Sequence, residues 1–249
     1  MKTFKNIKKI EIKDLSFKYD GIPVLKDLNV EFESGKLIVI MGPNGAGKTT
    51  LFKLIDLLLT PQKGKILADG HDIFEFSKKE RMEWRKNMGF VFQEPFLLNS
   101  SVWKNLAYPL SLRKIPKDEI KEKVDKLIAQ SGLEKVSKKK PHQLSGGDKK
   151  RVAFAQTIIT DPKILLLDEP TASVDPENSI LLEDMINKMK KPGIFILMST
   201  HNLFQSKRLA DDVGFMHKGN IIEFGTKDEI FEAPSFPITS KFIKGEISL

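Results

Sequence analysis

Residues 42–50 carry the clearest chemical pattern in the chain, Gly-Pro-Asn-Gly-Ala-Gly-Lys-Thr-Thr. Glycines let consecutive backbone N–H groups turn toward one anion, and the N-terminus of a helix adds its partial positive charge. In this pattern the lysine reaches phosphate oxygens and the hydroxyl that follows it reaches Mg²⁺. The apolar run 37–41 comes directly before the loop. The stretch therefore predicts a site for nucleotide phosphates and Mg²⁺, with Lys48 and Thr49 as its main side chains.

Two adjacent carboxylates follow a second apolar run. Residues 164–167 are predicted to form a buried parallel strand, and Asp168 and Glu169 come directly after it. Ligands of open α/β sheets bind at the carboxyl ends of the strands. We therefore expect Asp168 to hold Mg²⁺ together with the Thr49 hydroxyl. Glu169 is expected to face the γ-phosphate and to orient or deprotonate the attacking water.

A second anion-binding pattern consists of Ser145, Gly146 and Gly147. These residues precede a helical run at 149–160, so a hydroxyl and free backbone N–H groups are expected at a helix start. One chain thus carries two phosphate-binding helix ends, about a hundred residues apart.

Periodicity predicts the elements that position these residues. Residues 10–32 alternate apolar and polar side chains, which indicates short antiparallel strands. A helix is expected from residue 48 to about residue 59, ended by Pro61. Ser77 and Glu80 have the capping-box spacing for another helix, to about residue 86. Short strands are expected at 66–68 and 89–92.

Residues 94–159 have a different, helical character, with predicted helices at 102–106 and 117–130. The alternation of strands and helices resumes at residue 164, which implies a parallel sheet covered on both faces. Strands are expected at 164–167, 194–199, 213–217 and 221–224, and helices at 202–209 and after Asp175-Pro176. Thr226 and Glu229 form a second capping box, and the tail after it has no strong pattern.

Composition excludes several kinds of chemistry. The 249 residues contain no cysteine, so disulfides, thiolate metal sites and cysteine nucleophiles are excluded. Neither a signal peptide nor a membrane-spanning stretch is predicted, and a cytoplasmic setting is expected. The net charge of +8 fits either a basic face for anionic lipid or nucleic acid, or a solvated lysine-rich surface. We favour the solvated surface, because the lysines are spread along the whole chain.

These motifs, in this order, make the chain resemble the nucleotide-binding subunits of ATP-binding-cassette (ABC) transporters over nearly its full length. The resemblance implies an α/β P-loop NTPase fold of ABC type, with a mixed, mainly parallel core sheet and an antiparallel N-terminal β-subdomain. It implies a single domain over residues 1–249, made of a RecA-like lobe (about 1–93 and 160–249) and an α-helical signature subdomain (about 94–159). The implied ligands are ATP and Mg²⁺.

The resemblance also assigns roles to residues. Tyr19 is implied to stack on adenine, and Gln93 to reach both Mg²⁺ and the attacking water. His201 is implied to contact the γ-phosphate, as the third catalytic residue beside Glu169 and Gln93. The implied metal ligands are Thr49, Gln93 and Asp168. The remaining implied ATP-binding residues are Gly42, Asn44, Gly45, Ala46, Gly47, Lys48, Thr49, Thr50, Ser145, Gly146, Gly147 and Asp175.

In the family the Ser145–Gly147 element belongs to the signature motif, which grips the ATP of a second subunit. The resemblance thus implies a head-to-tail homodimer with two ATP molecules sandwiched in it. It also implies docking, near residues 93–98, on separate transmembrane permease subunits at the cytoplasmic face of the membrane. An extracytoplasmic substrate-binding protein would be an indirect partner, and no nucleic acid is expected. Two residues depart from the family pattern. Asp148 stands where Gln or Glu is commoner, and Gln156 stands where many relatives carry Arg, which leaves the ATPase rate open.

We expect an importer ATPase coupled to transmembrane transport. His201-Asn202 and the stretches 208–211 and 242–246 are similar to the ATPases of oxyanion importers, especially of tungstate, with phosphate next. Two alternatives stay open. One is a mechanical or DNA-associated ATPase, although those usually carry a long coiled coil where this chain has a short insert. The other is a lipoprotein-release or cell-division ATPase, which would differ in its partner rather than in its active site.

Overall fold

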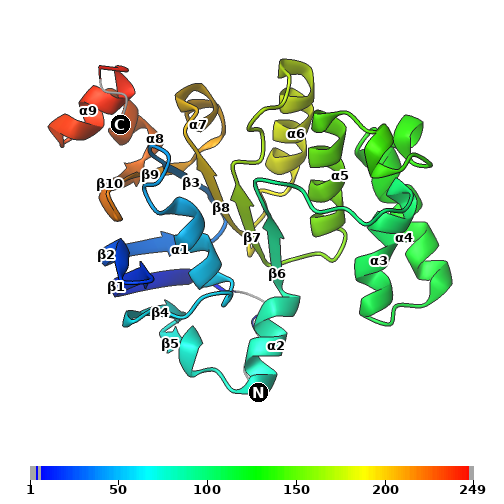
Figure 1. The fold of residues 1–249 in the computed structure, drawn as a ribbon, viewed down its shortest axis with the longest axis horizontal. Helices are drawn as coiled ribbons and strands as arrows, with labels where there is room; N and C mark the ends of the chain where they lie inside the picture. Colours follow the sequence, from blue (N-terminus) through cyan, green and yellow to red (C-terminus); the bar gives the residue numbers. More distant parts are fainter. Residues whose placement is uncertain (1–3, 5–6, 247–249) are drawn as a thin grey trace.

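A computed structural model describes residue 4 and residues 7–246, which form two sheets surrounded by helices (Figure 1). The central sheet contains five parallel strands and one antiparallel edge strand, β10. Its order is β10 (Asn220–Thr226), β9 (Asp212–His217), β3 (Leu37–Met41), β8 (Phe195–Thr200), β7 (Ile164–Asp168) and β6 (Met88–Val91). The expected mixed, mainly parallel core is therefore confirmed.

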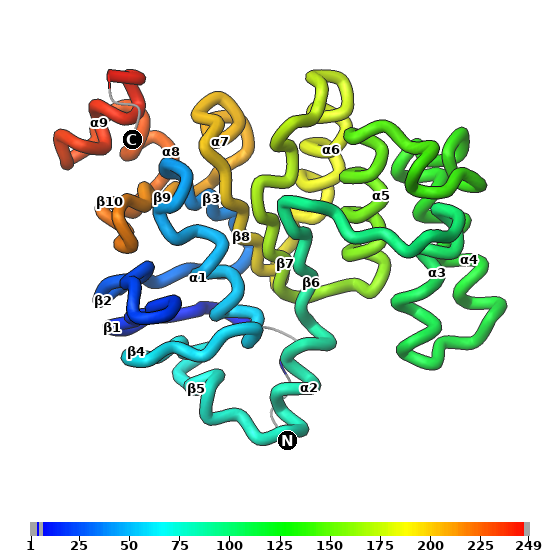
Figure 2. The backbone as a smooth tube through the Cα atoms, in the orientation of Figure 1, coloured from blue at the N-terminus to red at the C-terminus, as the bar shows by residue number. Residues whose placement is uncertain are grey.

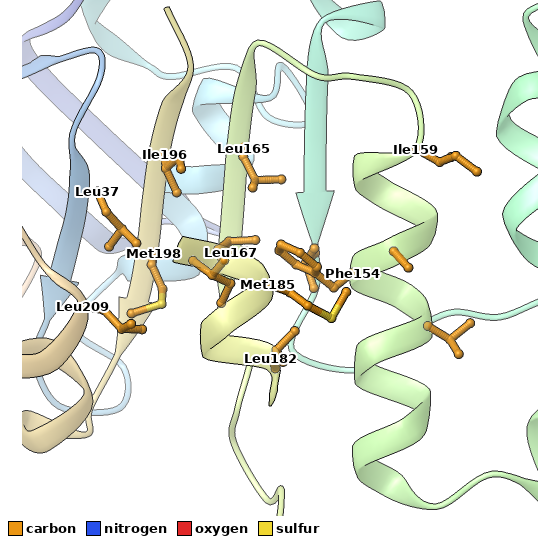
Figure 3. Close-up of a cluster of buried hydrophobic side chains, with 14 of the residues drawn as sticks. Leu37, Phe154, Ile159, Leu165, Leu167, Leu182, Met185, Ile196, Met198 and Leu209 are labelled. Carbon is orange, nitrogen blue, oxygen red and sulfur yellow. The ribbon is translucent and has the colours of Figure 1, made fainter. Parts of the chain in front are cut away.

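Both faces of this central sheet are covered. In β3, Leu37, Val39 and Met41 pack into one hydrophobic cluster and Ile38 and Ile40 into another. The first cluster lies between the sheet and α5 (Gly146–Ile158) and α6 (Pro176–Lys188) (Figure 3). The second is shared with α1 (Lys48–Ile55), α2 (Lys78–Lys86) and the N-terminal sheet. Burial on both faces explains why the parallel strands are continuous apolar runs rather than alternating ones.

The N-terminal sheet is antiparallel, as expected, with the order β2 (Ile22–Glu33), β1 (Lys9–Tyr19), β4 (Lys63–Ala68) and β5 (His71–Asp72). The short strands expected between residues 10 and 32 are in fact two long ones. Their pairing shifts register after Ile12, and Asp14 and Asp27 near the shifts take positive φ angles of 49° and 42°. Such bulges keep the apolar residues of a long twisted strand on the buried face.

The helical region lies beyond α5, away from the N-terminal sheet (Figure 1). A long connection leads to it from the end of β6 (Figure 2). Its helices α3 (Val102–Leu112) and α4 (Lys117–Gln130) contribute Leu106, Val124 and others to the same cluster as the central sheet. The division at about residues 93 and 160 stays a prediction. The shorter helices are α7 (Leu203–Leu209), α8 (Lys227–Glu232), α9 (Pro237–Ile243) and the 3₁₀ turns Ile73–Glu75, Glu134–Val136 and Pro141–Gln143.

Three helix boundaries differ from the predictions by three residues or more. Helix α5 begins three residues early because Ser145 caps it, and α3 continues six residues further than expected. Helix α1 ends at Ile55 rather than near residue 59. There Leu57 takes a left-handed φ of 57°, and the N–H of Leu58 bonds to the Lys53 carbonyl at 2.9 Å. This is a Schellman end with leucine where glycine is usual, so the sequence offers no stop signal at this position, before Pro61.

Helix α9 falls in the tail that carried no strong pattern. Pro237 occupies its first turn, where the missing N–H costs nothing. The ring of Phe242 packs on Phe215 of β9 with centroids 4.8 Å apart. A contact with the central sheet therefore stabilises this short helix, which its own sequence would not predict.

The C-cap of α1, Asp56, is predicted to destabilise the fold at neutral pH. Burial raises the pKa of Asp56 from 3.8 to about 6, although Arg85 opposes the shift. A raised folded-state pKa means that ionisation is disfavoured in the native state, so the penalty is absent below about pH 4 and complete above about pH 6. Asp56→Asn should therefore stabilise the protein by about 1–2 kcal/mol at pH 8 and by less at pH 5. Thermal unfolding at both pH values checks this, with the exposed Asp118→Asn as control. An equal gain at pH 5 and pH 8 would contradict it.

Candidate functional site

The phosphate loop connects β3 to α1 and is shaped by glycines with positive φ. Gly42 has φ 152°, and a Cβ there would lie 2.1 Å from the Met216 carbonyl oxygen. Gly47 has φ 111°, and a Cβ there would lie 2.7 Å from the Leu25 side chain. Both positions therefore need glycine for space as well as for conformation. The result is a tight turn that ends at the N-terminus of α1.

Lys48 is buried at this turn. Its Nζ donates to the carbonyl oxygens of Gly42 and Pro43 at 2.7 and 2.9 Å, and lies 3.7 Å from Glu169 Oε1. Burial lowers the pKa of Lys48, and the neighbouring Glu169 and Asp168 carboxylates oppose this shift. The ammonium group is therefore held over the loop. The hydrogen bonds that it donates become stronger when an anion replaces the neutral carbonyls as acceptor.

Asp168 is the last residue of β7 and receives two hydroxyls. Thr49 Oγ1 donates to its Oδ2 at 2.7 Å, and Ser199 Oγ donates to its Oδ1 at 2.6 Å. Hydroxyl and carboxylate oxygens are the ligands that Mg²⁺ prefers. The part of the chain that the structure describes contains no group of three acidic, His or Cys residues that could hold a metal alone. The donor set fits an ion that takes its other ligands from phosphates and water.

Glu169 is held by its neighbours on several sides. Its backbone N–H donates to Ser199 Oγ at 3.0 Å, and its carbonyl accepts from Lys150 Nζ of α5 at 3.1 Å. Its side chain is 7 % exposed, and His201 Nδ1 lies 2.8 Å from its Oε2. Its φ of 48° is a strained conformation for a residue with a side chain, which is typical of functional sites.

Two adjoining cavities gather the predicted residues. A cavity of about 410 Å³ is lined by residues 44–50, Val24, Gln93 and Glu169. A second of about 700 Å³ is lined by Asn44, Gln93, Glu169 and His201 and by the loop that follows Glu169. Tyr19 ends β1 with its ring edge-on to Phe17 at 4.8 Å, and is 40 % exposed. Among the described residues, the predicted site residues that line neither cavity are Tyr19, Gly42, Asp168, Asp175 and residues 145–147.

Ser145 caps α5, and its hydroxyl is engaged within the same turn. Its Oγ accepts from the Asp148 N–H at 3.0 Å and donates to Asp148 Oδ2 at 2.8 Å. Asp175 caps α6 in the same way, and hydrogen bonds from Asn178 lower its pKa. A Cβ at Gly147 would lie 2.6 Å from Asn178, so glycine lets the starts of α5 and α6 approach each other. The structure thus brings Gly147 beside the Asp175 cap but not into the phosphate site.

Sequence reasoning missed Ser199 and Lys150. Ser199 pairs with Asp168 in the parallel register of β8 and β7, so a polar residue near the end of a buried strand was an available signal. Lys150 is buried on α5, and burial lowers its pKa. Nothing in its local pattern distinguishes it from the exposed lysines around it. Gln156, one of the two departures, lines a separate groove.

Comparisons with known proteins agree with this geometry. Residues 25–172 match the family described as ABC transporter. The phosphate import ATP-binding protein PstB 2 of Natronomonas pharaonis is 33 % identical over 247 residues, covering 96 % of this chain and 87 % of the relative. The methionine import ATP-binding protein MetN 1 of Bacillus thuringiensis is 37 % identical over 230 residues, with 92 % and 68 % covered.

A solved structure shares both fold and sequence. It is cbiO1 from Clostridium perfringens, described as part of the ABC transporter complex cbiONQ, with a TM-score of 0.82 and 34 % identity over 97 % of this chain and 100 % of that chain. The family match covers more than half of the chain, and the relatives align over most of their own length. The assignment therefore does not depend on the phosphate loop alone. The chain therefore belongs to the ABC transporter family, as an ATP-binding, ATP-hydrolysing nucleotide-binding subunit.

Proposed function

We propose that this chain is the ATPase subunit of an ABC importer, docked as a homodimer on transmembrane permease subunits at the cytoplasmic face of the membrane. The observation that carries the proposal is the arrangement of Lys48, Thr49, Asp168, Glu169 and His201 around one loop, with a second anion-binding helix end outside that site. Among the described residues, no helix is both long and apolar enough to cross a bilayer.

The phosphate loop would bind the ATP phosphates through its backbone N–H groups and Lys48, with Tyr19 against the adenine. Thr49, Asp168 and Gln93 would hold Mg²⁺. When bound, the ion would neutralise charge on the phosphate oxygens as the terminal bond breaks. Ser199 donates to one Asp168 oxygen, and the other, now bonded to Thr49, would be the metal ligand. Gln93 lines both cavities, which supports its proposed contact with the ion and the attacking water.

Glu169 would take a proton from the attacking water, and His201 would contact the γ-phosphate. The Glu169 carboxylate is buried but open to the cavity, as a general base must be. One nitrogen of the His201 ring already lies 2.8 Å from this carboxylate, so its other nitrogen is free to reach a phosphate oxygen. The pair can therefore position the water and the γ-phosphate relative to each other.

The homodimer is supported by the separation of the two anion-binding helix ends. Ser145 and its glycines lie at the start of α5, whereas the phosphate loop starts α1, and no cavity described here contains both. A second copy in head-to-tail orientation would bring the Ser145 end of one chain onto the ATP of the other. Hydrolysis then removes the γ-phosphate that both subunits contact, and the dimer opens.

A large groove supports docking on the membrane subunits. It has a volume of about 1100 Å³ and lies between α2, β6, α3 and α5. Its rim exposes apolar side chains, above all Phe96, which is 78 % exposed. Exposed apolar patches of this kind mark interaction sites. The lining includes Pro95 and Phe96 from the region expected to dock, and the adjoining Phe92.

The charge of this groove indicates what its partner carries. The charged residues that line it are all basic: Lys78, Arg81, Arg85, Lys86 and Arg113. Arg81 and Arg113 direct their guanidinium groups at backbone carbonyls, Arg113 at those of Thr160 and Lys86. The fitting partner is a short amphipathic segment with carboxylates beside its apolar face.

Charge reversal at Arg113 should weaken docking. Arg113→Glu replaces a cation of the groove by a carboxylate, which repels the carboxylates of the partner. The affinity for the permease subunits should therefore fall about tenfold or more. Co-purification over a salt series measures it. Lys114→Glu is the matched control, because it makes the same charge change next door but does not line the groove. Equal loss in both variants would contradict specific docking.

The proposed cargo is an inorganic oxyanion such as tungstate. The similarity of His201-Asn202 and of residues 208–211 and 242–246 to oxyanion-importer ATPases supports it, together with the phosphate-import relative. The relative described as a methionine import protein supports methionine as the competing cargo. The experiment is to purify the complex with its extracytoplasmic binding protein and titrate that protein with tungstate, molybdate, phosphate and methionine. Stimulation of hydrolysis by methionine but by none of the oxyanions would overturn the assignment.

A further inference from the structure

A buried polar bridge joins three segments beside the site and has no part in the roles given above. Gln205 of α7 is 1 % exposed. Its Nε2 donates to Thr171 Oγ1 at 2.6 Å and to Glu183 Oε1 of α6 at 3.0 Å. The bridge therefore ties α6 and α7 to the loop that follows Glu169.

The orientation of the Gln205 amide is fixed by its partners. Glu183 is buried, and Arg208 donates to both of its oxygens, with Nη2 at 2.7 Å from Oε1 and Nε at 3.0 Å from Oε2. Both oxygens of Glu183 therefore accept hydrogen bonds from Arg208. A flipped amide would place the Gln205 oxygen against this carboxylate. Both amide hydrogens are thus used, while Gln205 Oε1 has no donor among the described residues.

The bridge is connected to both ends of the contact between His201 and Glu169. Thr171 is two residues after Glu169, in a loop with left-handed residues at Glu169 and Ser173. The Gln205 N–H donates to Asn202 Oδ1 at 3.1 Å, within the first turn of the helix that follows His201. Thr171, Glu183, Glu169 and His201 all line the 700 Å³ cavity. A change at Gln205 can therefore alter the distance between the carboxylate and the imidazole.

We propose that Gln205 is a positioning residue for ATP hydrolysis, which sets the His201–Glu169 distance through Thr171 and the first turn of α7. The proposal rests on the roles proposed above for Glu169 and His201. It differs from them because Gln205 touches neither the nucleotide position nor the attacking water. Its effect should appear in the chemical step and not in ATP binding.

The test is Gln205→Leu, which keeps the volume and removes both hydrogen bonds. We expect kcat to fall about ten- to a hundredfold, with the KM for ATP within about twofold of the original value. Lys207→Ala is the matched control on the same helix. Lys207 pairs with Glu232 away from the site, so kcat should stay unchanged.

A double variant separates positioning from general damage. If Gln205 acts through His201, adding Gln205→Leu to His201→Ala should lower kcat no further than His201→Ala alone. Multiplied losses would overturn the inference, as would an unchanged kcat in the single variant. If His201→Ala itself leaves kcat unchanged, the role proposed for His201 fails, and the positioning inference fails with it. If His201→Ala lowers kcat but Gln205→Leu leaves kcat unchanged, the positioning inference is refuted while the role proposed for His201 stands.

Gln205→Glu covers the case in which Gln205→Leu does not fold. It places two carboxyl groups about 3.0 Å apart, as the Gln205 Nε2 and Glu183 Oε1 are now. Such a pair shares a proton at low pH and repels when both groups ionise. The kcat of this variant should therefore fall as pH rises, relative to the original protein, while the KM stays similar. Parallel pH profiles of the two proteins would overturn the inference.

Discussion

Replacing Glu169 by Gln is expected to lower the steady-state rate of ATP hydrolysis at least about a hundredfold and to leave ATP binding nearly intact. The amide keeps the size and the contact with His201 but cannot accept a proton from water. Lys48, Thr49 and the loop N–H groups, which are proposed to bind the phosphates, are unchanged. Phosphate release at saturating ATP measures the rate, and titration with a fluorescent ATP analogue measures binding.

The same variant tests the dimer. If hydrolysis opens an ATP-bridged dimer, Glu169→Gln with ATP should elute as a dimer in size-exclusion chromatography and as a monomer without it. Glu119→Gln, an exposed glutamate of α4, makes the same chemical change far from the loop and should behave as the original protein. An unchanged hydrolysis rate in Glu169→Gln would contradict the role of Glu169 as the general base. A Glu169→Gln variant that stays monomeric with bound ATP would contradict the ATP-bridged dimer.

The phosphate site could be predicted from sequence because its parts are local. Glycines, lysine and threonine follow one another in one loop, and the two carboxylates end one apolar strand. The contacts of Asp168 and Glu169 with Ser199 could not be read in the same way. They depend on β7 and β8 being neighbours in register, although 30 residues separate Glu169 from Ser199. Pairing of parallel strands is a property of the folded sheet rather than of either segment.

The same distinction explains the helix errors. The capping boxes at Ser77 and Thr226 each place two bonds within four residues, and both helices begin where predicted. The end of α1 depends on a left-handed leucine, and α9 depends on Phe242 meeting Phe215 across the fold. A tertiary contact stabilises α9, whereas α1 ends in a local turn whose left-handed residue is not the glycine that would signal it. Gln205 shows the same limit at the site, since its partners come from two other segments.

Lys48→Met should strongly weaken ATP binding without unfolding the protein. The thioether side chain keeps the buried stem but removes the one ammonium group held at the loop by Gly42 and Pro43. Loss of a charged hydrogen-bond partner from a desolvated site costs about 2–5 kcal/mol, so the affinity for ATP should fall at least about thirtyfold. The unfolding temperature without nucleotide should change little, because the burial of an ammonium group is itself unfavourable.

Thermal unfolding with and without ATP separates these two effects. A ligand that binds only the native state raises the unfolding temperature, so saturating ATP should stabilise the original protein and leave Lys48→Met unchanged. Lys53→Met, in the last turn of the same helix, is the matched control and should keep the full ATP-induced shift. If Lys48→Met retained that shift, the loop N–H groups alone would suffice for the phosphates. Lys48 Nζ lies 3.7 Å from Glu169 Oε1, so the lysine would then act on the carboxylate that takes the proton from the attacking water and not on binding.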